Sequence, residues 1–403
     1  MKRRVIEVSG VLGVLAAVIV LLQLAPATIE GQAPDAGLRT AWGDPDLQGI
    51  WTTNYDTPLE RPARYADREF FTEEERAAID SERARLLGTR RSEPGSEQDV
   101  GGAYDASIFL THKHLGERTS LIIDPPDGQL PAVTPEVQAR RDEMNDYHQA
   151  LLRSTDACRD GRAGCPPYGP RSPRWEEPAP HYLTRNSNRA YGPEDRSLSE
   201  RCIGARLPDF GGSTGFFLQV VQAPGTVSIF YDTGQGQGWQ RVIPVTDRPH
   251  LPPDVRQWWG DSRGRWEGDT LVVDVTNFSS KTDFFGAREN LHVVERWRRI
   301  DAETIEYVAT MEDPTTWVRP WTVTLELSLQ DNQANRIYKE PRCHEGNYGL
   351  PGLLAGARAG ERAFEEGRGP DPASLCIAGG TTACGGFGGG FAESGDEADP
   401  LQR

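Results

Sequence analysis

The sequence has 403 residues, 37% of them hydrophobic and 26% charged, which is enough to bury a core in one large domain or two ordinary ones. Its 44 Lys and Arg face 60 Asp and Glu, a net charge of -16. Because such a chain is repelled by nucleic acid and by anionic membrane surfaces, we expect neither as a partner. The 43 Gly and 30 Pro favour short elements joined by turns and argue against a helical bundle.

The first 27 residues have the pattern of a signal peptide. Basic residues at positions 2–4 precede an apolar run over 11–24, and Ala25-Pro26-Ala27 has the small-x-small form of a cleavage site. The run is short for a membrane span. We therefore expect a secreted or periplasmic protein with no membrane span after signal cleavage. An uncleaved anchor beginning near Val5 and twin-arginine export are the alternatives.

Cysteine usage agrees with export. All six cysteines lie beyond the signal peptide, and an even number in an oxidising compartment predicts disulfides. Their spacing favours two local loops and one long connection: Cys158–Cys165, Cys376–Cys384 and Cys202–Cys343. A metal site would need CxxC spacing, which these cysteines lack, so we expect no catalytic thiol.

The chain order indicates one β-rich domain over residues 47–378. An extended leader (28–46) precedes it, and a Gly-rich tail (379–403) that we expect to be disordered follows it. Two short helices are predicted inside the domain, at about 72–87 and 134–152. The first has acidic residues in its first turn, and the second has proline at its first helical position.

From residue 216 the hydrophobic pattern changes to alternation, so most barrel strands are expected over 216–340. The candidate strands are 216–222, 226–232, 239–245, 270–276, 291–299, 304–311, 320–329 and 335–340. Sequential strands with one apolar and one polar face predict a mainly β fold, an antiparallel meander closing as a barrel, with long irregular N-terminal segments. The charged stretch 261–269 is interpreted as a turn with ion pairs, or as a polar rim around a pocket.

Several motifs resemble those of an uncharacterised family of secreted bacterial proteins. They are PDLQGIWT (45–52), SLSERC (197–202), GDSRGRWEGDTLVVDVTNF (260–278), NLHVVERW (290–297) and CHEGNYGLP (343–351). The resemblance spans nearly the whole mature chain and implies no particular reaction. Gly49-Ile50-Trp51 also resembles the Gly-x-Trp opening of lipocalin-like barrels, in which the Trp closes the barrel floor.

Sequence motifs for cofactors and metals are missing. The chain contains no Walker loop, GxGxxG or HExxH, so we expect no cofactor and no metal. His112 and His114 share one side of a possible strand and could form a metal pair with His148 or Glu117. Two exposed histidines beside a loop are the alternative, and the one we adopt.

Glu295 is the most informative candidate. It shares a strand face with apolar residues such as Val293 and Trp297, where a carboxylate needs a partner or a raised pKa. A structural pair with Arg263 or Arg319 is one interpretation. A general acid/base or a polar anchor for a ligand is the other.

Two function classes follow, and whether the protein is an enzyme stays open. The first is a barrel that binds a small apolar or aromatic-containing ligand, with Arg263, Arg296, Trp51 and Trp297 as ligand-binding residues. The second is a secreted hydrolase or lyase, with carbohydrate as the candidate substrate class and four catalytic candidates: Glu295, His292, His344 and Glu345. A structural or interaction protein of the envelope is a third possibility.

Overall fold

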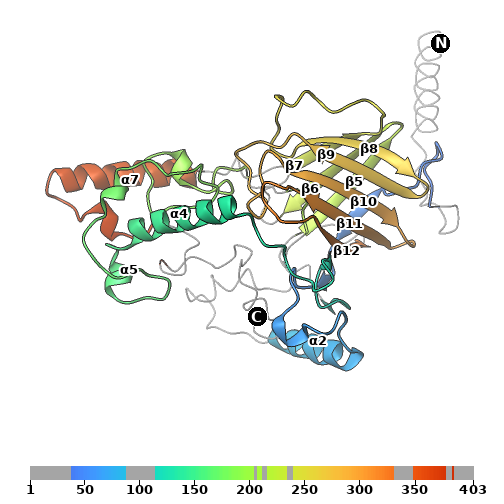
Figure 1. The fold of residues 1–403 in the computed structure, drawn as a ribbon, viewed down its shortest axis with the longest axis horizontal. Helices are drawn as coiled ribbons and strands as arrows, with labels where there is room; N and C mark the ends of the chain where they lie inside the picture. The colour runs from blue at the N-terminus through green and yellow to red at the C-terminus, as the bar shows by residue number, and fades with distance from the viewer. Residues whose placement is uncertain are drawn as a thin grey trace, which may run out of the picture. The chain divides into compact units, whose positions relative to one another are not determined.

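The computed structural model describes residues 38–87, 114–203, 207–210, 216–233, 239–330, 348–377 and 384. Its centre is an antiparallel sheet (Figure 1). The strands follow one another in the order β7 (Trp239–Pro244), β6 (Thr226–Thr233), β5 (Phe216–Ala223), β1 (Gly49–Thr52), β12 (Trp321–Leu329), β11 (Thr304–Glu312), β10 (His292–Arg299), β9 (Thr270–Thr276) and β8 (Asp261–Glu267). A tenth strand, β4 (Ile122–Asp124), pairs with β12.

The two ends of this row of strands meet. Nine antiparallel strands leave the outer two, β7 and β8, running in the same direction, so only a parallel contact can join them. That contact is a parallel bridge between Val245 and Gly264, next to a 2.9 Å hydrogen bond from the Thr246 N–H to the Gly264 carbonyl. A Cβ at Gly264 would lie only 3.0 Å from Ile243 Cγ2. The sheet is therefore a nearly closed barrel, which confirms the expected mainly β fold class.

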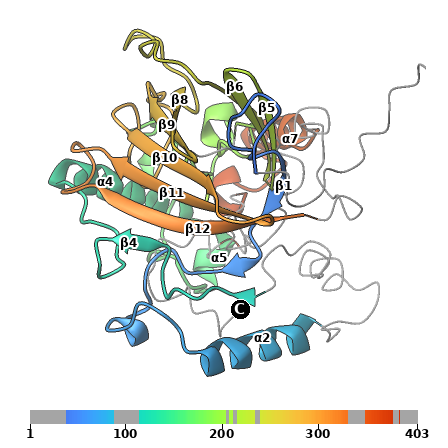
Figure 2. The same ribbon diagram turned by 90° about the vertical axis from the view of Figure 1, so that its right-hand side faces the viewer.

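Strand β1 departs from the simple meander. It lies between β5 and β12, with Trp51 opposite Leu218 on one side and Leu329 on the other. Figure 2 shows β12, β11, β10, β9 and β8 side by side in this order, with β1, β5 and β6 continuing the wall. The chain thus uses an N-terminal segment to join its two meanders.

Strand β8 corrects the interpretation of 261–269 as a turn. Ser262 is buried and Gly264 faces the closing contact, while Arg263 and Arg265 project outward to carboxylates. The side chains of β8 do alternate between the inner and outer faces of the barrel wall. Small residues, rather than large apolar ones, occupy the inner positions. The predicted strand 335–340 lies outside the described residues.

Alternate side chains from all nine strands of the row fill the barrel interior. Trp297 and Trp321 are both buried there, as the apolar face of each strand predicts. Trp297 packs edge-on against Tyr307, with ring centroids 4.5 Å apart, and Tyr231 stacks on Trp239 at 4.1 Å. The interior is therefore a continuous aromatic and aliphatic core.

Helices α2 (Glu73–Leu87) and α4 (Pro135–Leu152) lie within one residue of the expected ranges. Thr72 and Glu75 form a reciprocal capping box at the start of α2, and the Thr134 hydroxyl caps α4 by accepting from the Val137 N–H. A third long helix, α7 (Gly349–Glu365), was not predicted, because its start (Gly349-Leu-Pro-Gly352) has the composition of a turn.

Several short elements connect the strands and helices. They are β2 (Tyr55–Asp56), β3 (His114–Leu115), α5 (Asp156–Arg159) and the 3-10 helices η1 (Ala63–Tyr65), η3 (Pro173–Trp175), η4 (Pro193–Asp195) and η6 (Pro372–Ser374).

Both local disulfides are formed, as the spacing predicts: Cys158–Cys165 and Cys376–Cys384. Cys202 is also disulfide-bonded, but Cys343 lies outside the described residues, so the third pairing stays a prediction. The expected signal peptide and most of the expected leader and tail lie outside the described ranges too. Within those ranges, none of the helices combines the length and apolar character that crossing a membrane requires.

Candidate functional site

Glu295 is at the centre of a buried polar cluster inside the barrel. Its side chain on β10 is fully buried, and its carboxylate accepts a 2.5 Å bond from Arg241 Nη2 on β7 and a 2.8 Å bond from the Tyr307 hydroxyl on β11. Arg241 Nε also donates to Ser262 Oγ at 3.0 Å. Arg241 Nη1 donates to the Tyr231 hydroxyl on β6 at 3.5 Å. Five strands thus contribute to one hydrogen-bonded network.

The two buried charges of the cluster, on Arg241 and Glu295, neutralise each other. Burial is the largest single influence on Arg241 and opposes its charge, but the Glu295 carboxylate and the Tyr231 hydroxyl together outweigh burial and raise the pKa of Arg241. Burial also raises the pKa values of Tyr231 and Tyr307, so both phenols stay neutral. A buried ion pair whose donors and acceptors are matched is what a structural role requires. The expected partners were wrong: Arg263 bonds Asp261 at 2.6 Å and Arg319 bonds Asp124 at 2.7 Å.

The other predicted site residues divide between the two faces of the barrel wall. Trp297 and Trp51 are buried on the inside, and the Trp51 indole N–H donates to the Leu47 carbonyl at 3.0 Å. Arg296 projects outward and bonds Glu267 at 3.0 Å. His292 is also on the outer face, so neither shares a face with Glu295.

His292 belongs to a row of alternating carboxylates and imidazoles on the outer wall. Asp274 accepts from His292 Nε2 at 3.0 Å and contacts His250 Nε2 at 2.8 Å, while His250 Nδ1 contacts Asp261 at 2.8 Å. The hydrogen bond with Asp274 raises the pKa of His292, and the same bond lowers the pKa of Asp274. Because both nitrogens of His250 are used, the row attaches the β7–β8 connection to the wall.

The remaining candidates either lie outside the described residues or pair with other side chains. His344 and Glu345 lie outside the described residues, as does His112. His114 contacts Asp80 at 3.3 Å, and Glu117 pairs with Arg76 at 3.3 Å. In the described ranges, no group of three or more His, Cys, Asp or Glu side chains has a geometry for a metal ion.

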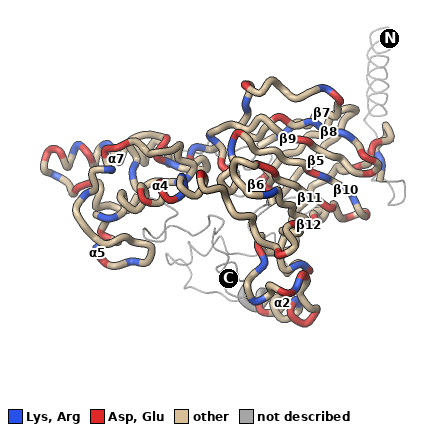
Figure 3. Tube along the Cα trace, in the orientation of Figure 1, with Lys and Arg blue, Asp and Glu red and all other residues tan. Residues whose placement is uncertain are grey.

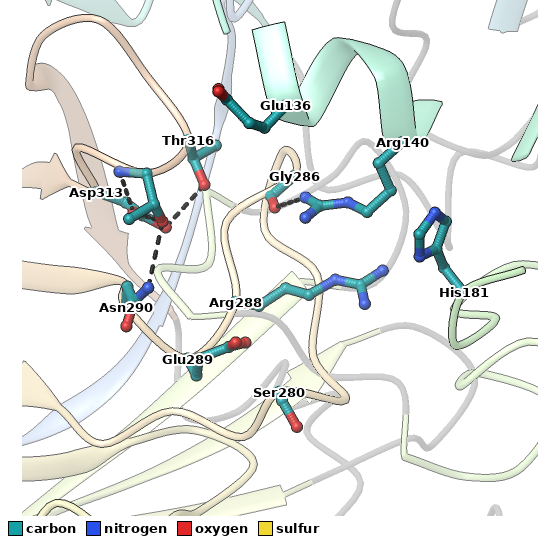
Figure 4. A pocket seen from close by; sticks show the side chains of 11 residues that line it. Glu136, Arg140, His181, Ser280, Gly286, Arg288, Glu289, Asn290, Asp313 and Thr316 are labelled. Atoms are coloured by element: carbon teal, nitrogen blue, oxygen red, sulfur yellow. Dashed lines mark hydrogen bonds between the residues drawn. The ribbon is translucent and has the colours of Figure 1, made fainter. Parts of the chain in front are cut away.

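A cavity of about 330 Å³ lies at the N-terminal half of α4, away from all of these candidates. Its walls come from α4, from His181, from the β9–β10 connection and from the turn after β11 (Figure 4). The side chains that matter most for its chemistry are Arg140, His181, Ser280, Arg288, Glu289 and Asp313.

Local hydrogen bonds fix these walls to one another. The Thr134 N–H donates to the Thr316 carbonyl at 2.9 Å, which holds the start of α4 against the turn after β11. Arg140 Nη2 donates to the Gly286 carbonyl at 2.7 Å. Gly286 has a φ of +95°, and a Cβ there would lie 3.2 Å from Val137 Cγ1. Glycine is needed at this position because the connection turns where it touches the helix.

Two guanidinium groups extend into the space between these walls (Figure 4). Burial and the neighbouring Arg288 lower the pKa of Arg140. The Nε of Arg288 is buried and has no hydrogen-bond acceptor among the described residues; the nearest carboxylate, Asp283, is 3.9 Å away. A buried donor without an acceptor is costly. The guanidinium of Arg288 is therefore less completely hydrogen-bonded than that of Arg241 inside the barrel.

The sequence analysis missed this site. Arg140 contacts a carbonyl 146 residues further along the chain, and no local motif marks such a pairing. The one available signal was the Arg140-Arg141 pair in a helix expected to pack on a sheet, because charged side chains at a packing face need partners there.

Comparisons with known proteins add no functional assignment. No protein-family model matches the chain, and no curated protein matches it either. Among solved structures, the fluorescent protein UnaG aligns with 15% identity and a TM-score of 0.20, over 32% of this chain and 85% of its own. A point mutant of UnaG aligns with 16% identity and a TM-score of 0.21, over 33% of this chain and 86% of its own. Similarity at this level carries no argument about the function of this chain.

Proposed function

We propose that this protein is a secreted or periplasmic barrel protein that binds a small molecule in the cavity beside α4. The observation that supports the proposal is that Arg140 and Arg288 both line the cavity. Within the described part of the chain each guanidinium has one hydrogen bond, to the Gly286 carbonyl and to the Tyr182 carbonyl respectively. A cavity of about 330 Å³ is at the lower end of the usual ligand-pocket range of roughly 300 to 1,000 Å³. The ligand is therefore small.

This proposal moves the ligand from the barrel interior, where the sequence analysis placed it, to the end of α4. The aromatic side chains expected to hold an apolar ligand, Trp51 and Trp297, belong to the packed core instead. The cavity beside α4 is lined by charged and hydroxyl-bearing side chains, which favour a polar ligand.

The hydrolase or lyase alternative has less support. Both oxygens of the Glu295 carboxylate are engaged, by Arg241 and by Tyr307, and a general acid/base needs an oxygen free for substrate. His292 is on the opposite face of the wall.

The test is native mass spectrometry of the mature protein purified from the periplasm without denaturation. We expect a bound small molecule in the wild type and its loss in Ser280→Trp, which places an indole at the cavity wall. Val318→Trp is the matched control, because Val318 is 66% exposed and does not line the cavity. Retention of the bound mass by Ser280→Trp, or the absence of any bound mass from the wild type, would overturn the proposal.

A further inference from the structure

The cavity brings two arginines close together in a protein whose charges otherwise alternate, and Glu136, Glu289 and Asp313 line it as well. Figure 3 shows Lys and Arg interspersed with Asp and Glu along the barrel strands and α4. In the cavity, by contrast, Arg140 and Arg288 approach closely enough for Arg288 to lower the pKa of Arg140. No carboxylate of the described residues lies within ion-pair distance of Arg140.

Most of the donor capacity of these two side chains is unused. Each guanidinium carries five N–H donors. Arg140 uses one on the Gly286 carbonyl at 2.7 Å, and Arg288 uses one on the Tyr182 carbonyl at 3.4 Å. Within the structured ranges, the remaining N–H groups, including the buried Arg288 Nε, have no protein oxygen at hydrogen-bond distance. They present a planar array of donors, which matches the two oxygens of a carboxylate.

The acidic side chains of the cavity have two different roles. Asp313 is occupied, because it accepts from the Thr315 hydroxyl at 2.6 Å and from the Thr316 hydroxyl at 2.8 Å, and so it stabilises the turn. Glu289 and Glu136 line the cavity, and neither forms an ion pair with a described side chain. Two arginines beside two such glutamates suit a ligand with one negative group and one donor group, rather than a polyanion.

We infer that the ligand is a small organic carboxylate that also carries an ammonium or hydroxyl donor, an amino acid or a hydroxy acid in chemical class. Its carboxylate lies across the Arg140 and Arg288 guanidinium groups, and its donor group faces Glu289. This inference rests on the proposed function, because it assigns a chemistry to the same cavity. Binding of such a carboxylate in the cavity requires no rearrangement of the buried cluster around Glu295.

The test is isothermal titration calorimetry of the full mature chain with a panel of amino acids and 2-hydroxy acids. Their methyl esters, plain short carboxylates and inorganic phosphate complete the panel. We expect the donor-bearing carboxylates to bind and the esters and phosphate not to bind. For a binding member of the panel, Arg288→Gln and Arg140→Gln should each raise Kd at least about tenfold, equivalent to about 1.4 kcal/mol. Glu289→Gln should reduce the preference over plain carboxylates.

Arg141→Gln is the matched control for Arg140→Gln. Arg141 is the next residue of α4, and its Nη2 donates to the Phe285 carbonyl at 3.0 Å, so both substitutions remove a contact between α4 and the same connection. Only Arg140 lines the cavity. Equal weakening by both variants would mean that the arginines position α4 and do not contact the ligand, which would overturn the inference.

The titrations distinguish an error in the ligand class from an error in the proposed function. If esters, neutral molecules or phosphate bind and Ser280→Trp abolishes that binding, the ligand class is wrong and the proposed function stands. If no member of the panel binds and no molecule co-purifies, both are overturned.

Discussion

The Glu295 cluster and the Arg288 cavity use the same types of side chain and differ in how completely these are paired. Inside the barrel, the Glu295 carboxylate accepts from Arg241 and Tyr307, and Arg241 also reaches Ser262. In the cavity, the buried Nε of Arg288 has no acceptor among the described side chains. Arg241 and Arg288 therefore differ in their degree of pairing. Pairing alone does not mark a ligand contact, because the Nε atoms of Arg118 and Arg153 are also buried and unpaired within the described residues; Arg288 differs from them in lining the cavity.

The largest expected effect is on the stability of the barrel. Glu295→Gln should lower the free energy of unfolding by about 3–5 kcal/mol, because it leaves Arg241 charged and buried without its counter-charge. Urea denaturation measures this loss. The double variant Arg241→Met/Glu295→Met should recover most of it, since neither charge remains. If Glu295→Gln instead left stability intact and removed ligand binding, the barrel interior would be the functional site.

The second largest effect is expected on the stability of α4, the helix that lines the cavity, as the pH falls. Burial, and then the nearby Arg185, lower the pKa of His148 on α4 from 6.5 to about 4. The unfolded chain therefore binds a proton near pH 6.5 that the folded chain does not, and stability falls as the pH falls from 6.5 towards 4. We expect this loss to be roughly 2–3 kcal/mol by pH 4.

Hydrogen exchange at pH 7 and at pH 4.5 would locate that loss. Protection should decrease in α4 before it decreases in β10 and β11, because the phenols and the guanidinium of the interior cluster do not titrate in this range. His148→Phe should abolish the pH dependence, whereas His114→Gln, at a side chain that is 58% exposed, should not. An unchanged pH dependence in His148→Phe would place the acid sensitivity elsewhere.

The smallest effect is expected at Arg288. Arg288→Gln should change the free energy of unfolding by less than about 1 kcal/mol. The buried Nε that it removes forms no hydrogen bond with a described residue, and its two other contacts are long, at 3.4 Å to the Tyr182 carbonyl and 3.9 Å to Asp283. Urea denaturation under the conditions used for Glu295→Gln gives the comparison directly. A loss as large as that of Glu295→Gln would show that Arg288 is structural and that the two regions do not differ.

The parts of the fold that follow from local patterns could be predicted. Strands β11 and β12 alternate cleanly, because large apolar residues such as Tyr307 and Trp321 occupy the inner positions. Thr72 and Thr134 mark the starts of α2 and α4 through their caps. Strand β8 escaped prediction because Ser262 and Gly264 stand where large apolar residues usually signal the inner face.

The partners across the barrel could not be predicted in the same way. That Glu295 is in an apolar row was visible from period-two alternation, but its pairing with Arg241 depends on the closure that brings β7 to β8. The cavity depends on a contact between α4 and a distant connection. Single-sequence patterns report local periodicity, so contacts set by the closed topology remain invisible to them.

The position of β1 has a consequence for the order of folding during synthesis. Trp51 pairs with Leu218 and with Leu329, so the first strand to be synthesised finds its last partner only after β12 has emerged. Until then one edge of β1 remains without its neighbour, and pairing β1 with β12 joins very distant segments of the chain. The two meanders can form early, because their strands are neighbours in the sequence. The pairing of β1 with β12 is the slow and late step, during which unpaired strand edges are exposed to aggregation. The barrel wall is therefore complete only once the chain has been synthesised as far as β12, because β1 pairs with both β5 and β12.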